Sequence, residues 1–139
     1  MLTDNVKQFL SENHRAVLTT FRKNGAAQMS ILSVGSYKDG VAFTTTEDRA
    51  KLANLRRYPR CSLLVSKDSW WGFVVLEGKA KVMSADNTDA DELRQALRDV
   101  FVAASGEEHP NWDEYDQAMR DDRRSAIIVV PDRIYGTAL

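Results

Sequence analysis

Short apolar runs and apolar–polar alternation, separated by turn signals, recur along much of the chain and predict β-strands. The stretches concerned are residues 15–46, which divide into three strands, and residues 60–66, 70–84 and 123–136. The Asn-Gly pair at 24–25 is a strong hairpin signal, and residues 38–40 supply the next turn. Gly72 and Gly78 are expected to be bulges or bends in the long strand 70–84.

Other stretches have the 3.6-residue period of helices. Residues 3–13 place Val6, Phe9 and Leu10 on one face, and a second helix is expected over about 48–57, ended by the proline at 59. From about residue 86 the helical period returns in a third stretch, and a short fourth helix follows it. The apolar positions of these two stretches are Leu93, Ala96, Leu97, Val100, Phe101, Trp112, Tyr115 and Met119.

The expected strands are joined by tight turns, and consecutive strands joined in this way pair antiparallel. About six such strands with singly inserted helices indicate an α+β fold, a small antiparallel barrel with short flanking helices. Pro131 is expected to mark the end or an edge of the last strand. No linker or repeat interrupts the 139 residues, so we expect one domain over residues 1–139.

The composition argues against several classes of function and assigns none. The chain has 28% charged residues and a formal net charge of −1, which gives little driving force for nucleic-acid binding. No apolar run is long enough for a signal peptide or a membrane span, so a cytoplasmic protein is expected. The single cysteine, Cys61, lies in an apolar run and is expected to be an inert buried thiol.

The common catalytic patterns are missing from the sequence. His14 and His109 lie in polar segments and are expected to have surface or capping roles, and no Cys/His/Asp spacing resembles a metal site. No serine lies in a G-x-S-x-G turn. Hydrolysis is therefore poorly supported, and no catalytic residue is assigned.

The start of the second helix is the unusual feature. Hydroxyl residues end the preceding strand, and the helix then begins with Arg49 and Lys51, although the N-terminus of a helix favours anions. Backbone N–H groups, hydroxyls and two cations at one point would suit a bound phosphate. The alternative is that both cations point into water or pair with Glu47 and Asp48.

The block "TTTEDRAKLANLRRYPR" at 44–60, with "WWGFVVLEGKA" at 70–80, resembles the split-barrel superfamily of pyridoxamine 5′-phosphate oxidase. The later "HPNWDEYDQAMRDDRR" and "IVVPDRIYG" are similar to its actinobacterial branch, which uses the deazaflavin coenzyme F420. The resemblance implies a six-stranded antiparallel split barrel. It also implies a homodimer with two cofactor sites at the subunit interface.

The resemblance also implies site residues. Arg49 and Lys51 match the residues that hold the cofactor phosphate, and Trp71 matches an aromatic residue that reaches the site from the neighbouring subunit. A packing role in the barrel is the alternative for Trp71, and whether Trp70 or Trp71 faces the ring stays open. The positions that match the family's cofactor-binding residues are Gln28, Met29, Ser30, Thr44, Thr45, Arg49, Lys51, Asn54 and Trp71.

By this resemblance the chain is an F420-dependent oxidoreductase that transfers a hydride between the cofactor and an unsaturated small organic substrate. A flavin-type cofactor carries the reaction itself, which agrees with the lack of a catalytic triad. Two alternatives remain: an FMN-dependent oxidoreductase, and a non-enzymatic module that binds a flavin or deazaflavin.

The strand pattern itself also favours a homodimer. A small barrel buries one face of a strand in its interior, and the long strand 70–84 has large apolar residues on both faces. The residues expected on one face are Trp71, Phe73 and Val75, and those expected on the other are Trp70, Val74 and Leu76.

Overall fold

The computed structural model describes residues 2–139, which form one curled antiparallel sheet and four helices. The strands are β1 (Arg15–Phe21), β2 (Ala27–Ser33), β3 (Gly35–Tyr37), β4 (Gly40–Thr46), β5 (Arg60–Ser66), β6 (Phe73–Met83) and β7 (Arg124–Tyr135). The helices are α1 (Asp4–Glu12), α2 (Ala50–Arg57), α3 (Ala90–Ser105) and α4 (Trp112–Asp121). Within residues 2–139, no helix is long and apolar enough to span a membrane.

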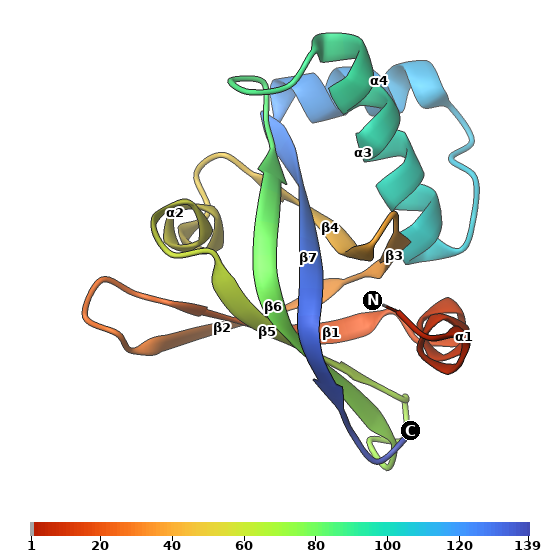
Figure 1. Cartoon of the computed structure of the whole chain (residues 1–139). Coiled ribbons are helices and arrows are strands. Elements are labelled where there is room, and N and C mark those ends of the chain that lie inside the picture. Colours follow the sequence, from red (N-terminus) through yellow and green to blue (C-terminus); the bar gives the residue numbers. More distant parts are fainter. Residues whose placement is uncertain (1) are drawn as a thin grey trace.

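The sheet has the strand order β2-β1-β5-β6-β7-β4-β3 and curls into a half barrel. Figure 1 shows α1 and α2 on opposite sides of this half barrel, while α3 and α4 lie together at one end, next to β4. The predicted α+β split barrel with flanking helices is confirmed. The sheet has seven strands because the second predicted strand is divided in two.

The main core fills the inside of the curled sheet. Val6, Phe9 and Leu10 of α1 pack into it, as do Leu52 and Leu55 of α2. The predicted face of the first helix is therefore confirmed, and Thr3 caps that helix by accepting a hydrogen bond from the Val6 N–H at 3.3 Å. Both short helices are held by burial of their apolar faces, since helices of this length are marginal alone.

A second, smaller core lies outside the half barrel, between α3 and the outer face of β4 and β7. Its buried residues are Ala42, Leu93, Ala96, Leu97, Val100, Tyr115, Ala126 and Ile128. Gly35 brings β3 close to α3, because a Cβ there would lie 2.2 Å from the carbonyl carbon of Ala103. This core fixes α3 and α4 beside the end of β4.

The second predicted strand changes its pairing partner at Val34. Before this residue β2 pairs with β1, and after it β3 pairs with β4. The Val34 N–H donates to the His14 carbonyl at 2.7 Å, and its side chain is fully buried. The stretch predicted as one strand therefore forms both β2 and β3, which lie at opposite edges of the sheet.

The strand predicted over 70–84 begins later than expected, whereas Pro131 lies at an edge of the last strand, one of its two expected places, since β4 pairs only with residues 124–129 of β7. Trp70 and Trp71 lie in the turn between β5 and β6, where Trp70 has a φ of +67° and the Lys67 N–H bonds the Gly72 carbonyl at 2.8 Å. Gly72 is thus part of this turn, whereas the register of β6 shifts at Gly78, as expected of a bulge.

The last strand does not end at Pro131. Pro131 lies opposite Gly78 at the bulge, and β7 continues past it to Tyr135. The bulge interrupts the regular ladder, so a residue without an N–H is accepted at this position.

The outer face of the sheet has an apolar band that crosses five strands. Neighbouring residues of the band face each other across strand pairs: Ile31 and Val17, Val17 and Leu64, Leu64 and Val75, Val75 and Tyr135. The side chain of Ile31 is 72% exposed and that of Met29, on the same strand, is 66% exposed. Ile31 and Met29 are therefore among the large apolar side chains that residues 2–139 leave exposed.

Candidate functional site

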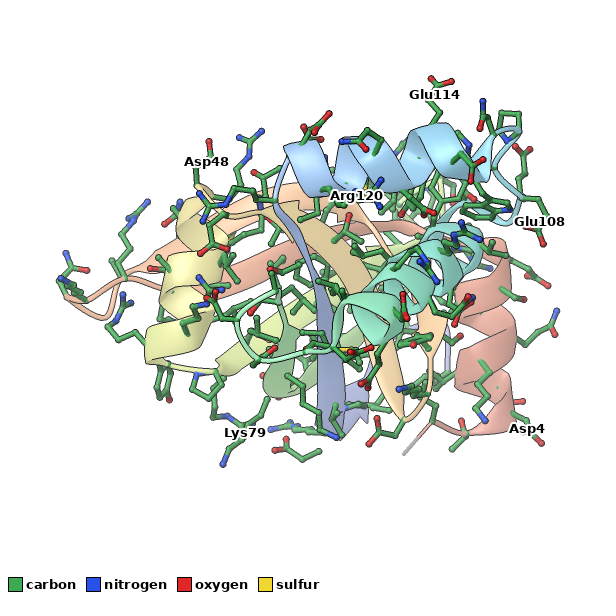
Figure 2. All side chains as sticks on the ribbon, turned by 90° about the horizontal axis from the view of Figure 1, so that it is seen from above. Asp4, Asp48, Lys79, Glu108, Glu114 and Arg120 are labelled. Carbon is green, nitrogen blue, oxygen red and sulfur yellow. The ribbon has the colours of Figure 1, made fainter. Side chains whose placement is uncertain are left out.

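The start of α2 has two cations, as the sequence predicted, and its first turn has no acidic residue. Arg49 is the N-cap residue, its side chain makes no capping hydrogen bond, and the first turn contains Lys51 but no acidic residue. The first N–H groups of a helix have no intrahelical partner, and here no side chain accepts from them. Figure 2 shows this end of α2, near the labelled Asp48, beside the end of α4.

A third cation at this place was missed by the sequence analysis. Arg124, the first residue of β7, donates from Nη1 to the Thr44 hydroxyl at 3.1 Å. Its Nε is buried, and among residues 2–139 it is the single buried side-chain nitrogen or oxygen without a hydrogen-bond partner. The nearest carboxylate, that of Asp122, is 3.6 Å from Nε. Nothing in the sequence marks Arg124, because its place beside Thr44 depends on the pairing of β4 with β7.

These cations affect one another. The pKa of the Lys51 ammonium is lowered, first by burial and then by the positive charges of Arg49 and Arg124. A lysine with a lowered pKa lies where its charge is poorly compensated. An anion placed among the three side chains would reverse this effect.

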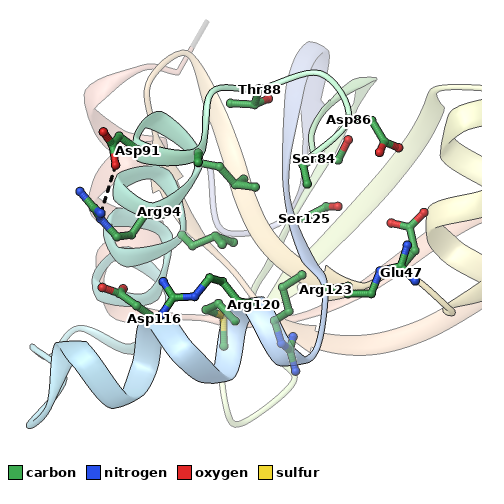
Figure 3. Close-up of a pocket in the computed structure, with 16 residues that line it drawn as sticks. Glu47, Ser84, Asp86, Thr88, Asp91, Arg94, Asp116, Arg120, Arg123 and Ser125 are labelled. Atoms are coloured by element: carbon green, nitrogen blue, oxygen red, sulfur yellow. Dashed lines mark ion pairs between the residues drawn. The ribbon is translucent and has the colours of Figure 1, made fainter.

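Three hollows meet at Arg124. The first, here called the anion hollow, has a volume of about 550 Å³ and is lined by residues 46–49 and 121–124. The second, the β4–α4 hollow, has about 620 Å³ and extends from Thr44 to His109 and Tyr115. The third, the α3–α4 pocket, has about 380 Å³ and is shown in Figure 3.

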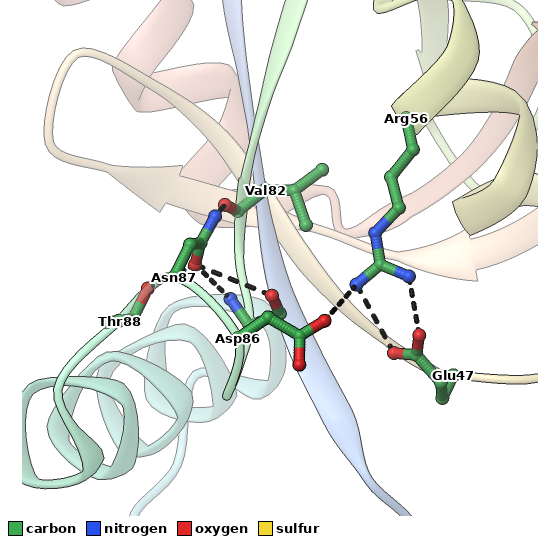
Figure 4. Close-up of polar contacts among 7 residues, drawn as sticks. Glu47, Arg56, Val82, Asp86, Asn87 and Thr88 are labelled. Carbon is green, nitrogen blue, oxygen red and sulfur yellow. Dashed lines mark hydrogen bonds and ion pairs between the residues drawn. The ribbon is translucent and has the colours of Figure 1, made fainter.

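The acidic neighbours of Arg49 and Lys51 bind other groups. Glu47 pairs with Arg56 at 2.5 Å (Figure 4), and this hydrogen bond holds the pKa of the Glu47 carboxyl below its ordinary value. Asp48 accepts a hydrogen bond from the Thr46 hydroxyl at 2.6 Å. The alternative that Glu47 and Asp48 pair with the two cations is therefore not what the structure has. Its other form, in which the cations point into water, fits Arg49, which is exposed, better than the half-buried Lys51.

The two acids on the far wall of the anion hollow are also engaged. Asp121 accepts a hydrogen bond from the Gln117 amide at 2.8 Å, and Asp122 lies near Arg124. The lining of the hollow therefore contains four acids and three bases, but each acid has a partner of its own. The first turn of α2 keeps its positive charge.

The threonine side chains at the end of β4 lie on two opposite faces of the strand. Thr44 faces Arg124, and Thr46, which was not predicted as a site residue, is on the same face of the strand. Thr45 is 3% exposed and shares the opposite face with the buried Phe43, toward the barrel interior. Thr44 and Thr46 are therefore the hydroxyls beside the cations.

The predicted residues on β2 are also divided between faces. The Gln28 side chain points inward and accepts a hydrogen bond from the Asn54 amide at 3.1 Å, and Ser30 is half-buried on the same side. Met29 points outward to the exposed face.

Asn54 is buried and uses its polar atoms within the protein. Its amide also donates to the Thr20 hydroxyl at 3.1 Å, and its oxygen accepts from Arg57 at 3.2 Å. Asn54 thus ties α2 to β1 and β2, and its contact with a cofactor stays a prediction.

Trp71 lies away from the other predicted residues of its own chain. Its side chain is 89% exposed, in the turn between β5 and β6. Figure 1 shows this turn beside the C-terminus, at the opposite end of the molecule from α4. Trp71 therefore does not line the anion hollow of its own chain.

The titratable side chains give little support to acid–base or nucleophilic catalysis. Burial raises the pKa of the Cys61 thiol to about 12, so the thiol stays protonated and unreactive. His109 is half-buried among Phe101, Trp112 and Tyr115, and its Nδ1 accepts the Asn111 N–H at 3.0 Å. In residues 2–139 no group of three His, Cys, Asp or Glu side chains is arranged to hold a metal ion.

The donors at the start of α2 suit a phosphate group. They combine free N–H groups of a helix N-terminus, two cationic side chains on α2, and the buried Nε of Arg124, which lacks an acceptor. A phosphate would give all of them a partner. A flavin-type phosphate cofactor therefore fits the residues present.

Comparison with known proteins agrees with this fold. Among solved structures, the chain is similar to the conserved hypothetical protein Rv2991 from Mycobacterium tuberculosis, with 20% identity, a TM-score of 0.78, and coverage of 98% of this chain and 84% of that one. An F420 reductase has 17% identity, a TM-score of 0.64, and coverage of 93% and 94%. HutZ, the heme storage protein from Vibrio cholerae, has 14% identity, a TM-score of 0.65, and coverage of 97% and 94%.

At these identities the structural likeness shows a shared fold and no more. The sequence itself matches the family described as pyridoxamine 5′-phosphate oxidase over residues 2–138, which is nearly the whole chain. The protein is a member of the pyridoxamine 5′-phosphate oxidase family, with the split-barrel fold of that family.

Proposed function

We propose that the protein is an F420-dependent oxidoreductase that transfers a hydride between the deazaflavin and an unsaturated small organic substrate. The observation that carries this proposal is the group of poorly compensated cations, Arg49, Lys51 and Arg124, around a helix N-terminus that has no acid. Membership of a family of flavin-type oxidoreductases and the likeness to an F420 reductase support it.

The residues that would hold the cofactor phosphate are Arg49 and Lys51, with Arg124 and the Thr44 hydroxyl beside them. Gln28, Met29 and Ser30 would line the ring from β2. When bound, a deazaflavin supplies the hydride chemistry, and the protein orients the reactants and excludes water. Apolar walls on the β4–α4 hollow, such as Val100 and Phe101, suit that second task.

FMN is the alternative cofactor, because it too carries a phosphate beside a tricyclic ring. A third possibility is a binding module without turnover, which the likeness to a heme storage protein keeps open. Turnover separates this module from an enzyme. Oxidation of reduced F420 by a panel of enones and quinones supports the enzyme, and its complete absence with every acceptor supports the module.

Titration of the protein with F420 and with FMN, followed by tryptophan fluorescence, tests the proposal. We expect F420 to bind at micromolar concentration or below. Lys51→Ala should weaken binding by about 1.5–3 kcal/mol, the range for a hydrogen bond to a charged group, or roughly tenfold or more in Kd. Lys7→Ala, on the exposed face of α1, is the matched control and should bind like the parent.

Two results would count against this assignment. Tight binding of FMN with no binding of F420 would transfer the proposal to an FMN-dependent oxidoreductase. Equal affinity of the parent and Lys51→Ala for either cofactor would mean that the start of α2 holds no phosphate.

We also propose a homodimer with the cofactor at the subunit interface. The apolar band on the outer face, which includes Ile31 and Tyr135, needs a cover that the chain itself does not provide. The exposed turn with Trp71 lies far from the anion hollow of its own chain, so it would serve a site on a partner. Two-fold symmetric dimers are the commonest oligomers that bury such a face.

A further inference from the structure

The α3–α4 pocket is a concave space next to the anion hollow. It lies between the loop after β6, the inner faces of α3 and α4, and the start of β7 (Figure 3). Its volume of about 380 Å³ is within the range of small-molecule sites. Arg123 and Arg124 form the wall that it shares with the anion hollow.

The floor of the pocket is apolar. Leu93 and Leu97 of α3 and Met119 of α4 line it, and the first two belong to the buried second core. The buried hydroxyl residues Ser84 and Ser125 are on the opposite wall. A ligand of this pocket would therefore need an apolar body.

The acids around the pocket are already neutralised. Asp116 is 6% exposed and accepts two hydrogen bonds from the guanidinium of Arg98, which holds the pKa of its carboxyl below the ordinary value. Asp91 pairs with Arg94 at 3.1 Å. Glu47 pairs with Arg56, and Asp86 lies 4.0 Å from the same guanidinium (Figure 4).

Two cations of the pocket form no ion pair. Arg120 donates a hydrogen bond to Gln117 at 2.8 Å, and the ion pairs of residues 2–139 include neither Arg120 nor Arg123. Both line the pocket near the end of α4. The rim therefore has free positive charge beside an apolar floor.

We propose that the α3–α4 pocket binds a small amphipathic organic anion. The apolar body of this ligand lies against Leu93, Leu97 and Met119, and its carboxylate or sulfonate meets Arg120 and Arg123. Four of these five residues lie outside the anion hollow, whose lining includes Arg123 alone among them, so the two sites can be tested separately.

The fluorescent anion 8-anilino-1-naphthalenesulfonate is a suitable probe, since it combines an apolar body with one sulfonate. We expect saturable binding at one site per chain. The double variant Arg120→Gln, Arg123→Gln should weaken this binding roughly tenfold, as expected for lost charge-assisted hydrogen bonds. The uncharged probe N-phenyl-1-naphthylamine should bind the same variant nearly as well as the parent.

A second variant tests the apolar part of the pocket. Ala90 lines the pocket from the exposed start of α3, so Ala90→Trp should fill part of it and weaken both probes. Glu92→Trp, at an exposed position of the same helix that does not line the pocket, is the matched control and should leave both unchanged. The thermal unfolding midpoint of every variant checks that the fold is kept.

Two measurements separate this pocket from the anion hollow: saturation with F420 or FMN, and the variant Arg49→Ala, because Arg49 lines the hollow and not the pocket. The sulfonate probe should bind as before in both cases, whether or not either cofactor binds. Loss of the probe with Arg49→Ala would place it in the anion hollow and overturn the proposal. Binding that is unchanged in both the arginine double variant and Ala90→Trp would overturn it as well.

Discussion

Arg49 occupies the N-cap position of α2, where a small hydroxyl or amide side chain would accept hydrogen bonds from the first N–H groups. As the N-cap of α2 it leaves the first N–H groups without an acceptor. We predict that Arg49→Ser stabilises the apo protein by about 0.5–2 kcal/mol, the usual value of a good N-cap. Urea unfolding of the apo protein measures the change.

The same substitution should weaken cofactor binding, because it removes one of the proposed phosphate contacts. Thr3→Ala, which removes the cap of α1, is the control and should lower stability instead. If Arg49→Ser lowers apo stability, then the arginine stabilises the helix start and the unfavourable arrangement inferred here is wrong.

The lowered pKa of Lys51 makes binding depend on pH. Burial and two neighbouring cations lower this pKa in the free protein, whereas a bound phosphate would raise it. Between these two values binding takes up a proton, so we predict that cofactor affinity falls as the pH rises through the alkaline range. Calorimetric titration at several alkaline pH values measures this dependence.

Lys51→Arg should remove this dependence, because an arginine stays protonated throughout that range. A pH profile that is identical for the parent and Lys51→Arg would show that Lys51 does not titrate with binding.

The sequence pointed to Arg49 and Lys51 because both lie in one short segment at a recognisable helix start. Arg124 could not be identified as a site residue from the sequence. It comes 80 residues after Thr44, and only the antiparallel pairing of β4 with β7 brings the two side chains together. The different orientations of Thr44 and Thr45 likewise depend on which face of β4 turns inward.

At the level of elements, α2 is fixed to the sheet by one buried amide. Asn54 bonds Thr20 on β1 and Gln28 on β2, and it also accepts from Arg57. We predict that Asn54→Ala lowers the free energy of unfolding by about 1–3 kcal/mol, because buried partners lose their hydrogen bonds. Chemical denaturation of the apo protein checks this value.

The neighbouring Ala53 is exposed, and Ala53→Ser serves as the control with little expected change. Full stability of Asn54→Ala, with loss of cofactor binding, would instead favour direct contact between Asn54 and the cofactor.

Most elements could be predicted because their signals are local. The faces of α1 and α3, the turns and the bulge at Gly78 all follow from residue spacing. The division at Val34 could not be predicted, since it arises when one continuous run of residues changes pairing partner. The place of Trp70 was missed for a similar reason: apolar residues normally favour a strand, and a positive φ is rare for tryptophan.

For the whole molecule, the apolar band on the outer face predicts self-association. Ile31 is exposed near one end of this band, so Ile31→Glu should place a charge in the proposed interface. We expect the parent to be a dimer at micromolar concentration and Ile31→Glu to shift toward the 15.7 kDa monomer. Light scattering coupled to size exclusion measures both.

Asn5→Glu, on the exposed side of α1, introduces the same charge away from the band and should leave the dimer intact. A parent protein that is monomeric under these conditions would contradict the proposed dimer and the role of the Trp71 turn in a partner's site.

The position of β2 at one end of the sheet has a further consequence. Its seven residues contain no charge and no proline, and those are the features by which end strands commonly resist pairing with other chains. A newly made chain therefore presents an unguarded template for intermolecular β-pairing until the free edge of β2 is covered. Assembly would then protect the protein from aggregation as well as complete its binding site.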